Sequence, residues 1–305
     1  MNLYSYILLA CCILLAATVA FLSVKLKRLK TSVKNNADPK LVANVIAEEK
    51  KLLENVESGL NNDEFKMYLQ FSVDNKTKKL VSAEALSRWE SASGEVFFPG
   101  KYIGVMEKFG LITRLDYCMF ESACKKLSEW KGTEFDDISI SCNFTRITIS
   151  EKDFVAKIQE ISDRYKFDRY KLHIEITEDS IEKNLDIAMK NIRYAKDLGF
   201  CIALDDIGSG YTSLKNLCQY PIDIVKIDRA ILLLSNTERG KKLFLGIISL
   251  AHNLNLQVVC EGVETEAQND LVYASDCDFI QGWYYSKALP EAAAEEFARN
   301  YTKAL

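Results

Sequence analysis

The chain has 305 residues, 48% of them hydrophobic, and carries a formal net charge of −4. This length allows one large domain or two ordinary ones, and the acidic balance disfavours non-specific binding to nucleic acid. There are only two histidines, and the nine cysteines show no Cys-x-x-Cys spacing. A histidine-based zinc site, a Ser-His-Asp triad and a disulfide framework are therefore disfavoured. We expect buried free thiols and no nucleic-acid partner.

Residues 1–24 are predicted to form a transmembrane anchor helix. No charged side chain occurs from Asn2 to Val24, and about 20 apolar residues suffice to cross the hydrocarbon core of a bilayer. A basic cluster follows at once, with no basic side chain before the apolar run: Lys25, Lys27, Arg28, Lys30 and Lys34. The positive-inside rule then places the N-terminus outside and the rest of the chain in the cytoplasm. We expect residues 3–30 to contact membrane lipid.

Two other interpretations of this apolar run are less favoured. A cleavable signal peptide would have a charged n-region, a shorter apolar run and a small-x-small cleavage site. A lipoprotein site at Cys11 would leave too short an apolar stretch before the cysteine.

Residues 25–47 are predicted to be a basic juxtamembrane linker that leads into a helix, and residues 48–305 to be one soluble domain. Asp38-Pro39 is a helix-start signal. From Phe65 onward, short apolar runs alternate with longer amphipathic segments. The strand-like runs fall near 66–71, 79–86, 138–143, 171–177, 200–205, 223–227, 256–261 and 278–282. The helical patterns include 113–130, 151–165, 184–198, 238–255 and 265–274.

Strands that alternate with helices in this way predict an α/β fold, a TIM-like (β/α)8 barrel. An open doubly wound sheet is the main alternative, but no Gly-x-Gly-x-x-Gly segment follows an early strand.

Polar side chains recur near the ends of these apolar strands. They are Glu84, Asn143, Glu175, Asp205, Asp206, Lys226, Glu261 and Gln281. Barrel enzymes place their chemistry at the carboxyl ends of the strands, on one face. Because a lone buried carboxylate is costly, a convergent set of carboxylates calls for cations.

The acidic members form an all-oxygen ligand set that suits Mg²⁺ or Mn²⁺ better than zinc. The candidate metal ligands are Glu84, Asn143, Glu175, Asp205, Asp206 and Glu261. Two divalent ions close together are the usual device for hydrolysing a phosphodiester. Lys226 adds a cation that would orient or deprotonate the attacking water, or stabilise charge on the phosphate. Residues 207–213, with two glycines directly behind the acidic pair, form a candidate mobile loop.

At this point the residues resemble a known family, the EAL domain. Glu84-Ala85-Leu86-Ser87-Arg88-Trp89 is similar to the signature motif. Further ordered matches are Glu175-Ile176-Thr177-Glu178, Asp205-Asp206-Ile207-Gly208-Ser209-Gly210-Tyr211, Lys226-Ile227-Asp228-Arg229, Glu261-Gly262-Val263-Glu264 and Gln281-Gly282. The resemblance covers about residues 48–291, a single EAL domain behind the anchor.

The resemblance implies a bacterial barrel phosphodiesterase that linearises cyclic di-GMP to pGpG with two Mg²⁺ or Mn²⁺ ions, usually as a homodimer. Glu84, Asn143, Glu175, Asp205 and Asp206 would bind the metals, joined by Glu261 in the metal–water network. Lys226 would hold the catalytic water, and Glu178 would tether the glycine loop. The remaining substrate contacts would come from Gln70, Leu86, Arg88, Glu264 and Gln281.

The sequence departs from the family pattern at a few positions. Phe71-Ser72 stands where the family often has Pro-Ile, and Ile207 and Ser209 replace Phe and Thr in the glycine loop. None of these changes removes a candidate metal ligand. The predicted activity is therefore hydrolysis at the bacterial inner membrane. The alternatives are a non-catalytic cyclic di-GMP receptor or a protein-binding EAL module, which typically lose a ligand or the loop-supporting glutamate.

Overall fold

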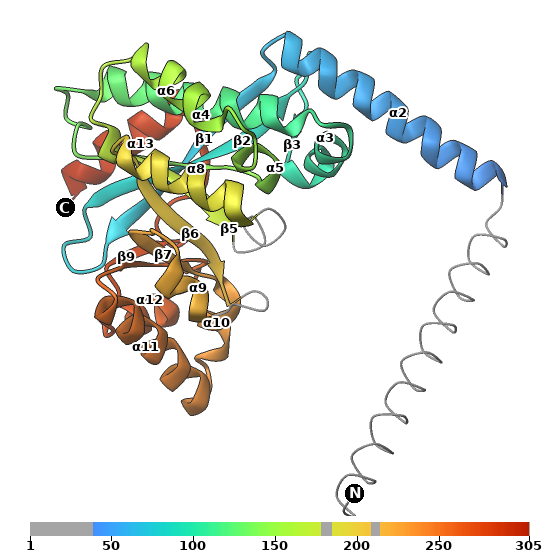
Figure 1. Ribbon diagram of the computed structural model, residues 1–305. Coiled ribbons are helices and arrows are strands. Elements are labelled where there is room, and N and C mark those ends of the chain that lie inside the picture. Colours follow the sequence, from blue (N-terminus) through green and yellow to red (C-terminus); the bar gives the residue numbers. More distant parts are fainter. Residues whose placement is uncertain (1–38, 178–184, 209–213, 305) are drawn as a thin grey trace, which may run out of the picture. The chain divides into compact units, whose positions relative to one another are not determined.

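The computed structural model describes residues 39–177, 185–208 and 214–304 (Figure 1). The predicted anchor at 1–24, the linker up to residue 38 and Glu178 lie outside the described residues. Within the described part of the chain, no helix is both long and apolar enough to span a bilayer. The chain divides after Glu54 into two units, and the sheet lies entirely in the second.

The centre of the second unit is a closed barrel of eight strands. Its strand order is β1-β9-β8-β7-β6-β5-β4-β2, and pairing between β1 and β2 closes the ring. The strands are β1 (Phe65–Asp74), β2 (Leu80–Glu90), β4 (Ser139–Asn143), β5 (Leu172–Thr177), β6 (Cys201–Ile207), β7 (Ile224–Ile227), β8 (Gln257–Cys260) and β9 (Phe279–Gln281). Two short strands extend the sheet, β3 (Val96–Phe97) and β10 (Leu289–Pro290). All eight predicted strands are confirmed, and so is the TIM-like barrel.

One strand departs from an all-parallel (β/α)8 barrel. β1 runs antiparallel to both of its barrel neighbours, opposite β2 (Gln70 beside Glu84) and opposite β9 (Ser72 beside Gln281). Only residues 75–79 separate β1 from β2, and a connection this short can form a hairpin but no parallel crossover. The turn is held by Asp74, whose carboxylate accepts hydrogen bonds from the backbone N–H groups of Lys76 and Thr77.

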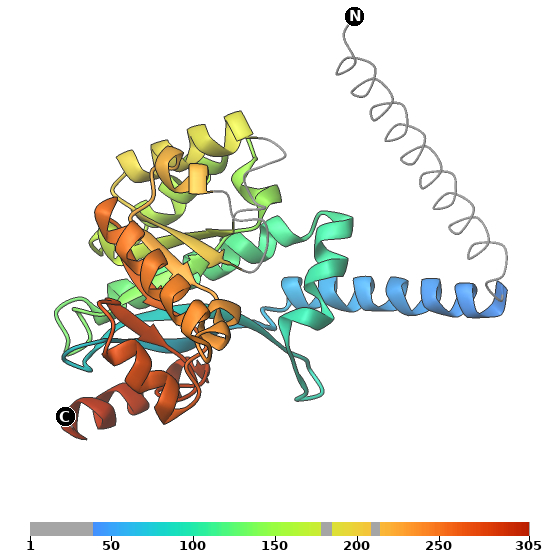
Figure 2. The ribbon, with the colours of Figure 1, turned by 90° about the horizontal axis from the view of Figure 1, so that it is seen from below.

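Helices cover the outside of the barrel, and most of them connect its parallel strands (Figures 1 and 2). They are α3 (Ile103–Phe109), α4 (Ile112–Trp130), α5 (Arg146–Ile149), α6 (Phe154–Asp163), α8 (Leu185–Asp197), α9 (Leu214–Gln219), α10 (Arg229–Leu234), α11 (Glu238–Asn253), α12 (Glu266–Tyr273) and α13 (Glu291–Ala304). A further helix, α2 (Pro39–Asn61), precedes β1 and begins in the first unit. Two 3₁₀ turns, Pro99–Lys101 and Arg169–Lys171, precede α3 and β5. The five helical patterns expected from the sequence correspond to α4, α6, α8, α11 and α12.

The core lies between the barrel and its helices, and the period of each element explains why. In α4, Leu115, Met119 and Phe120 recur at helical spacing and are buried; each such side chain contributes about 1.5–3 kcal/mol through burial. In β4, alternate residues face opposite sides of the sheet. Ile140 and Cys142 are fully buried, and the Cys142 thiol reaches the carbonyl of Met119 in α4 at 3.8 Å. Ser139, Ser141 and Asn143, which alternate with them, therefore point into the barrel.

The cysteines of the described part of the chain are all free thiols. Cys124, Cys142, Cys260 and Cys277 are buried, and burial raises the pKa of each thiol. Free thiols are confirmed for the described residues, but burial is confirmed for these four alone, since Cys118 and Cys201 are half-buried and Cys218 is exposed.

Candidate active site

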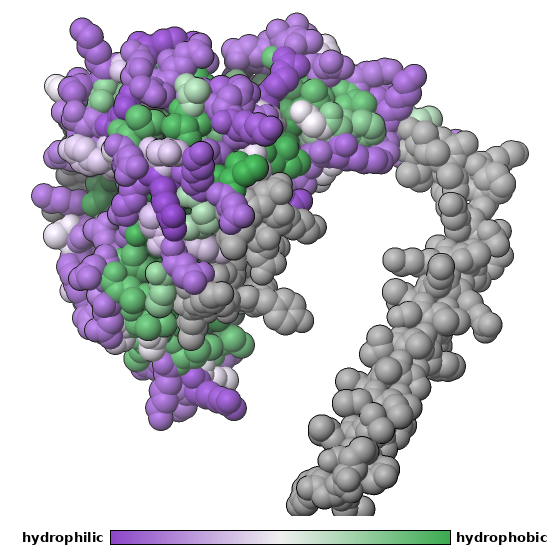
Figure 3. Space-filling model, in the orientation of Figure 1, coloured by the Kyte–Doolittle hydropathy of each residue, from purple (hydrophilic) through white to green (hydrophobic). Residues whose placement is uncertain are grey.

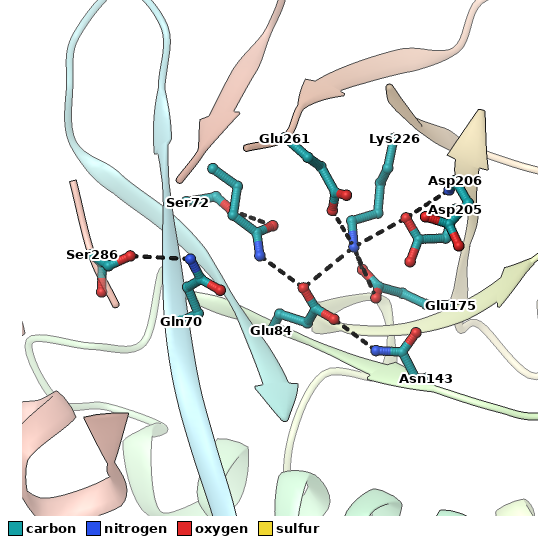
Figure 4. Close-up of polar contacts among 11 residues, drawn as sticks. Gln70, Ser72, Glu84, Asn143, Glu175, Asp205, Asp206, Lys226, Glu261 and Ser286 are labelled. Carbon is teal, nitrogen blue, oxygen red and sulfur yellow. Dashed lines mark hydrogen bonds and ion pairs between the residues drawn. The ribbon is translucent and has the colours of Figure 1, made fainter. Parts of the chain in front are cut away.

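The polar side chains expected at the strand ends converge at the carboxyl end of the barrel. Figure 4 shows most of them gathered around Lys226. They come from six strands and the residue after β8: Glu84, Asn143, Glu175, Asp205, Asp206, Lys226, Glu261 and Gln281. Glu84 is not at a strand end, because β2 continues to Glu90 where it pairs with β1 and β3.

Glu84 is held by two amides. Asn143 donates to its Oε1 at 2.7 Å, and Gln281 donates to its Oε2 at 2.7 Å. The Gln281 amide is itself oriented by Ser72, whose hydroxyl donates to Oε1 at 3.2 Å. Glu84 is only 8% exposed. Both of its oxygens are held by side chains from strands that are distant in sequence. This arrangement preorganises the carboxylate.

Lys226 is the electrostatic centre of the site and is only 2% exposed. Its Nζ lies 2.7 Å from Glu261 Oε1, 3.0 Å from Glu175 Oε1, 3.4 Å from Glu84 Oε2 and 3.5 Å from Asp205 Oδ1. Burial alone would lower the pKa of Lys226, but these carboxylates outweigh it and raise the pKa well above its usual value. Lys226 is therefore an ammonium ion at neutral pH.

One ammonium ion does not neutralise the five acids around it, of which Glu261 is half-buried and Asp206 is exposed. Burial raises the pKa of Glu175 well above its usual value, although Lys226 opposes the shift. Burial also raises the pKa values of Asp205 and Asp206, and it raises that of Glu261 to about 8. Glu84 differs: burial raises its pKa, but Lys226 and the two amide donors outweigh burial and lower it. The cluster therefore stabilises additional positive charge.

The donor set fits divalent metal ions. One carboxylate oxygen from each of Asp205, Asp206 and Glu261 lies within 4.8 Å of the others, and hard oxygen donors of this kind suit Mg²⁺ or Mn²⁺. Asp206 has a left-handed backbone conformation, with φ 62°, unusual for a residue within a strand. The β6–β7 pairing also shifts register between Leu204 and Ile207. This local irregularity presents two successive carboxylates at the same end of the barrel.

Gly262 permits a tight turn of the backbone directly after Glu261. Gly262 has φ 68°, and a Cβ there would lie 2.5 Å from the Cβ of Arg229. The close approach lets Arg229 reach Glu264, with Nη2 2.6 Å from Oε2. Gly262 thus sets the chain direction between Glu261 and Glu264.

Two hollows flank Leu86 beside the acidic cluster. The larger, about 500 Å³, is lined by Leu86, Asp116 and Asn143 among others. The smaller, about 260 Å³, includes Gln70, Leu86, Glu264 and Gln281, as well as Glu84 and Glu261. The structure therefore places all but one of the described candidate substrate contacts in the walls of these two hollows.

Arg88 is the exception. It is 9% exposed and does not line either hollow. Its guanidinium lies over the Phe98 ring at 4.8 Å and donates to the Ser87 carbonyl at 2.8 Å.

Asp116 is a site residue that the sequence reasoning missed. Its Oδ2 accepts hydrogen bonds from the Thr145 backbone N–H at 2.9 Å and from the Thr145 hydroxyl at 2.7 Å. The Thr148 hydroxyl donates to the same oxygen at 2.5 Å. Burial nevertheless raises the pKa of Asp116 to about 6. The available signal was an aspartate on the apolar face of α4, next to Leu115.

The sequence model of the EAL domain matches residues 53–288. The chain belongs to the EAL domain family. It is 33% identical over 239 residues to the signaling protein YkoW of Bacillus subtilis, covering 78% of this chain and 30% of that protein. It is 28% identical over 255 residues to the cyclic di-GMP phosphodiesterase NbdA of Pseudomonas aeruginosa, covering 83% and 33%. This EAL chain thus spans about a third of the length of these curated relatives.

Solved EAL structures have the same fold. A PaMucR phosphodiesterase in complex with c-di-GMP is similar with a TM-score of 0.75 and 26% identity, covering 80% of this chain and 99% of that one. An EAL domain protein from Listeria monocytogenes is similar with a TM-score of 0.72 and 29% identity, covering 82% and 97%.

Proposed function

We propose that this EAL domain hydrolyses cyclic di-GMP to linear pGpG with two Mg²⁺ or Mn²⁺ ions. The observation that carries the proposal is the preorganised acidic cluster around Lys226, next to the two hollows that share Leu86. A cyclic dinucleotide has two bases, and one hollow for each would hold a phosphodiester over the cluster. The names of NbdA and of the PaMucR complex support the substrate.

The acids would hold the metal ions, which supply positive charge to the attacking and leaving oxygens when bound. Asp205, Asp206 and Glu261 supply the closest set of oxygens. Glu84, Asn143 and Glu175 complete the proposed ligand set.

Lys226 has the role of a hydrogen-bond donor in this proposal. Because its surroundings keep it protonated, it orients the attacking water and does not deprotonate it. The water oxygen bonds to phosphorus as the bond from phosphorus to O3′ breaks; one proton of the water ends on O3′, and the other stays on the oxygen now bound to phosphorus. Glu261 Oε1, 2.7 Å from Nζ, limits where the ammonium group can point. Gln281 keeps Glu84 in position throughout the reaction.

We further propose that residues 1–24 anchor the domain in the bacterial inner membrane, with the N-terminus outside. The support is the uncharged apolar run followed by a basic cluster. A fusion of alkaline phosphatase to the N-terminus should be active and a fusion to the C-terminus inactive. The reverse pattern, or release of the chain from washed membranes by salt, would reject this topology.

A homodimer of EAL domains is proposed on the resemblance, and exposed apolar side chains are consistent with it. Leu233, Leu234, Leu243 and Leu245 of α10 and α11 are each more than a third exposed, and hydrophobic surface is visible over this part of the molecule (Figure 3). Sedimentation at equilibrium should give twice the chain mass, and Leu243→Glu should shift it toward the monomer.

The decisive experiment incubates the purified chain with cyclic di-GMP and either metal ion, and separates the products by chromatography. Linear pGpG is expected from the wild type and not from Glu84→Ala. Glu90→Ala, in the same strand but bonded to the Tyr68 hydroxyl outside the cluster, is the matched control. Tight binding without turnover would indicate a receptor. The absence of both binding and turnover would indicate a protein-contact role.

A further inference from the structure

A second cavity lies at the amino end of the barrel and has a volume of about 530 Å³. Its walls come from the first residues of successive strands, including Ser82 of β2, Ser139 of β4, His173 of β5 and Phe279 of β9. Such a volume lies within the roughly 300–1,000 Å³ of small-molecule sites. The proposed reaction does not use this end of the barrel.

Polar side chains line this cavity. Ser141 is 6% exposed and is one of them. Ser82, Ser139 and His173 line it as well and are half-buried. Their hydroxyls and ring nitrogens can each donate or accept a hydrogen bond. These groups therefore form a row of hydrogen-bonding positions that a ligand can use.

The charged groups of the cavity wall are already compensated. Lys196 Nζ lies 2.7 Å from Asp223 Oδ1, and that aspartate also accepts from the Ile202 N–H. Lys226, at the inner end, is surrounded by the carboxylates of the acidic cluster. The imidazole of His173 also lines the wall. Its neutral form offers one ring N–H donor and one ring nitrogen acceptor.

The remaining walls are apolar and partly aromatic, with Phe200, Phe279 and Val259 among them. A phosphate or carboxylate ligand would be buried there without a counter-ion, which is costly. A flat ring system that stacks on phenylalanine and bonds to hydroxyls and an imidazole has no such cost. We propose that this cavity is a second binding site, for a neutral planar heteroaromatic molecule that has a hydrogen-bond donor beside an acceptor.

Such a ligand would be coupled to the acidic cluster through shared walls. Glu175, Lys226 and Gln281 line the cavity and belong to the cluster at the carboxyl end. A ligand that shifts any of these side chains changes the affinity for metal ions, and the metal ions change the affinity for the ligand by the same factor. The coupling rests on the proposed function, whereas binding itself does not.

The test uses 7-azaindole, a neutral bicyclic probe with an N–H next to a ring nitrogen. Because the chain has only two histidines, ¹⁵N-histidine labelling of the full chain gives one reporter in the cavity and one outside it. His252 Nε2 lies 2.9 Å from Asp278 Oδ2, and this residue does not line the cavity. We expect saturable shifts of the His173 ring resonances, with a Kd on the order of 1 mM for so small a probe, and unchanged His252 resonances.

Two variants sharpen the test by ligand-observed NMR. His173→Phe keeps a ring but removes the donor and the acceptor, and should weaken the probe at least about 10-fold. His252→Phe should bind it as the wild type does. No saturable shift at His173, equal shifts at both histidines, or full affinity in His173→Phe would overturn the proposal. If His173→Phe does not fold, the titration of the labelled wild type decides.

Adding Mn²⁺ tests the coupling separately. A change in the probe's Kd of at least about 3-fold is expected, and an unchanged Kd would reject the coupling but leave the site. If the chain binds the probe at His173 but neither binds nor cleaves cyclic di-GMP, the proposed function is rejected and the second binding site stands.

Discussion

The two ends of the barrel are built from the same strands and have opposite chemistry. In β5, His173 at the amino end is a neutral ring, whereas Glu175 two residues later is a buried acid beside Lys226. In β4, Ser141 lines the cavity, whereas Asn143 two residues later donates a hydrogen bond to Glu84 of the acidic cluster. The alternation of strand side chains places each pair inside the barrel. Position along a strand, and not the choice of strand, therefore decides whether a residue belongs to the charged or the neutral end.

The strongest test of this contrast replaces one buried lysine at each end. Lys226→Met removes the only ammonium group in contact with the acidic cluster among the described residues, and should lower turnover of cyclic di-GMP about 10³-fold or more. Lys171→Met removes a lysine that is 9% exposed and ion-paired with Asp136 at 2.6 Å just before β5. That variant should keep turnover within a few-fold of wild type, measured per folded protein. Equal losses would mean that Lys226 acts only through stability.

Divalent metal ions should distinguish the ends by their effect on unfolding. Mn²⁺ at 100 times its Kd should raise the free energy of unfolding by about 2.7 kcal/mol, measured as a shift in thermal denaturation. Asp205→Asn removes a ligand oxygen and should abolish most of the shift. Asp136→Asn, at the amino end, should leave it intact. A shift that survives in Asp205→Asn would place the ions elsewhere.

His173 predicts a loss of stability in acid. The unfolded chain takes up a proton at this histidine below about pH 6.5, but the folded chain does so only near pH 4. Stability from the neutral ring is therefore present at neutral pH and lost as the pH falls between these values. In urea titrations, His173→Phe should reduce the loss between pH 7.0 and 4.5 by about 2 kcal/mol. An unchanged difference between the two pH values would show that the ring is well hydrated.

Asp116, beside the charged end, predicts a smaller effect of opposite sign. Its pKa is about 6 in the folded chain against an ordinary 3.8, so the folded state binds the proton more tightly. Its contribution to stability is present in acid and is lost as the pH rises through 6. In the same urea titrations, Asp116→Asn should therefore increase the loss of stability on acidification by about 2 kcal/mol. The effects of His173 and Asp116 largely cancel in the wild type. A variant with both substitutions should therefore lose about as much stability between pH 7.0 and 4.5 as the wild type does.

The sequence alone predicted the barrel and most of the cluster, because strand period and strand-end polarity are local patterns. The direction of β1 was not predicted, since it depends on the short turn at 75–79 and not on apolar periodicity. The extent of β2 was missed because residues 87–89 are stabilised by pairing with β1 and β3. Asp116 was missed because its partners, Thr145 and Thr148, are brought to it only by the packing of α4.

His173 shows a different limit of sequence reasoning. A histidine within an apolar strand is normally a packed core residue. Volume, however, is a property of the assembled barrel: the side chains around His173 at the strand starts are small, including Ser82, Ser139 and Ala203. Whether the space they leave is filled or open cannot be derived from the period of any one strand.

The antiparallel first strand has a consequence for biosynthesis. Ser72 pairs with Gln281, and Leu69 pairs with Leu289, so strands near the two ends of the domain must meet before the ring can close. A ribosome delivers the amino-terminal partner first and leaves its edge unpaired while most of the domain is still being made. An unpaired edge is a template for aggregation, and pairing over such sequence distances is slow. A nascent chain that stalls before residue 279 should therefore depend strongly on chaperones, whereas release after residue 290 should allow the ring to close.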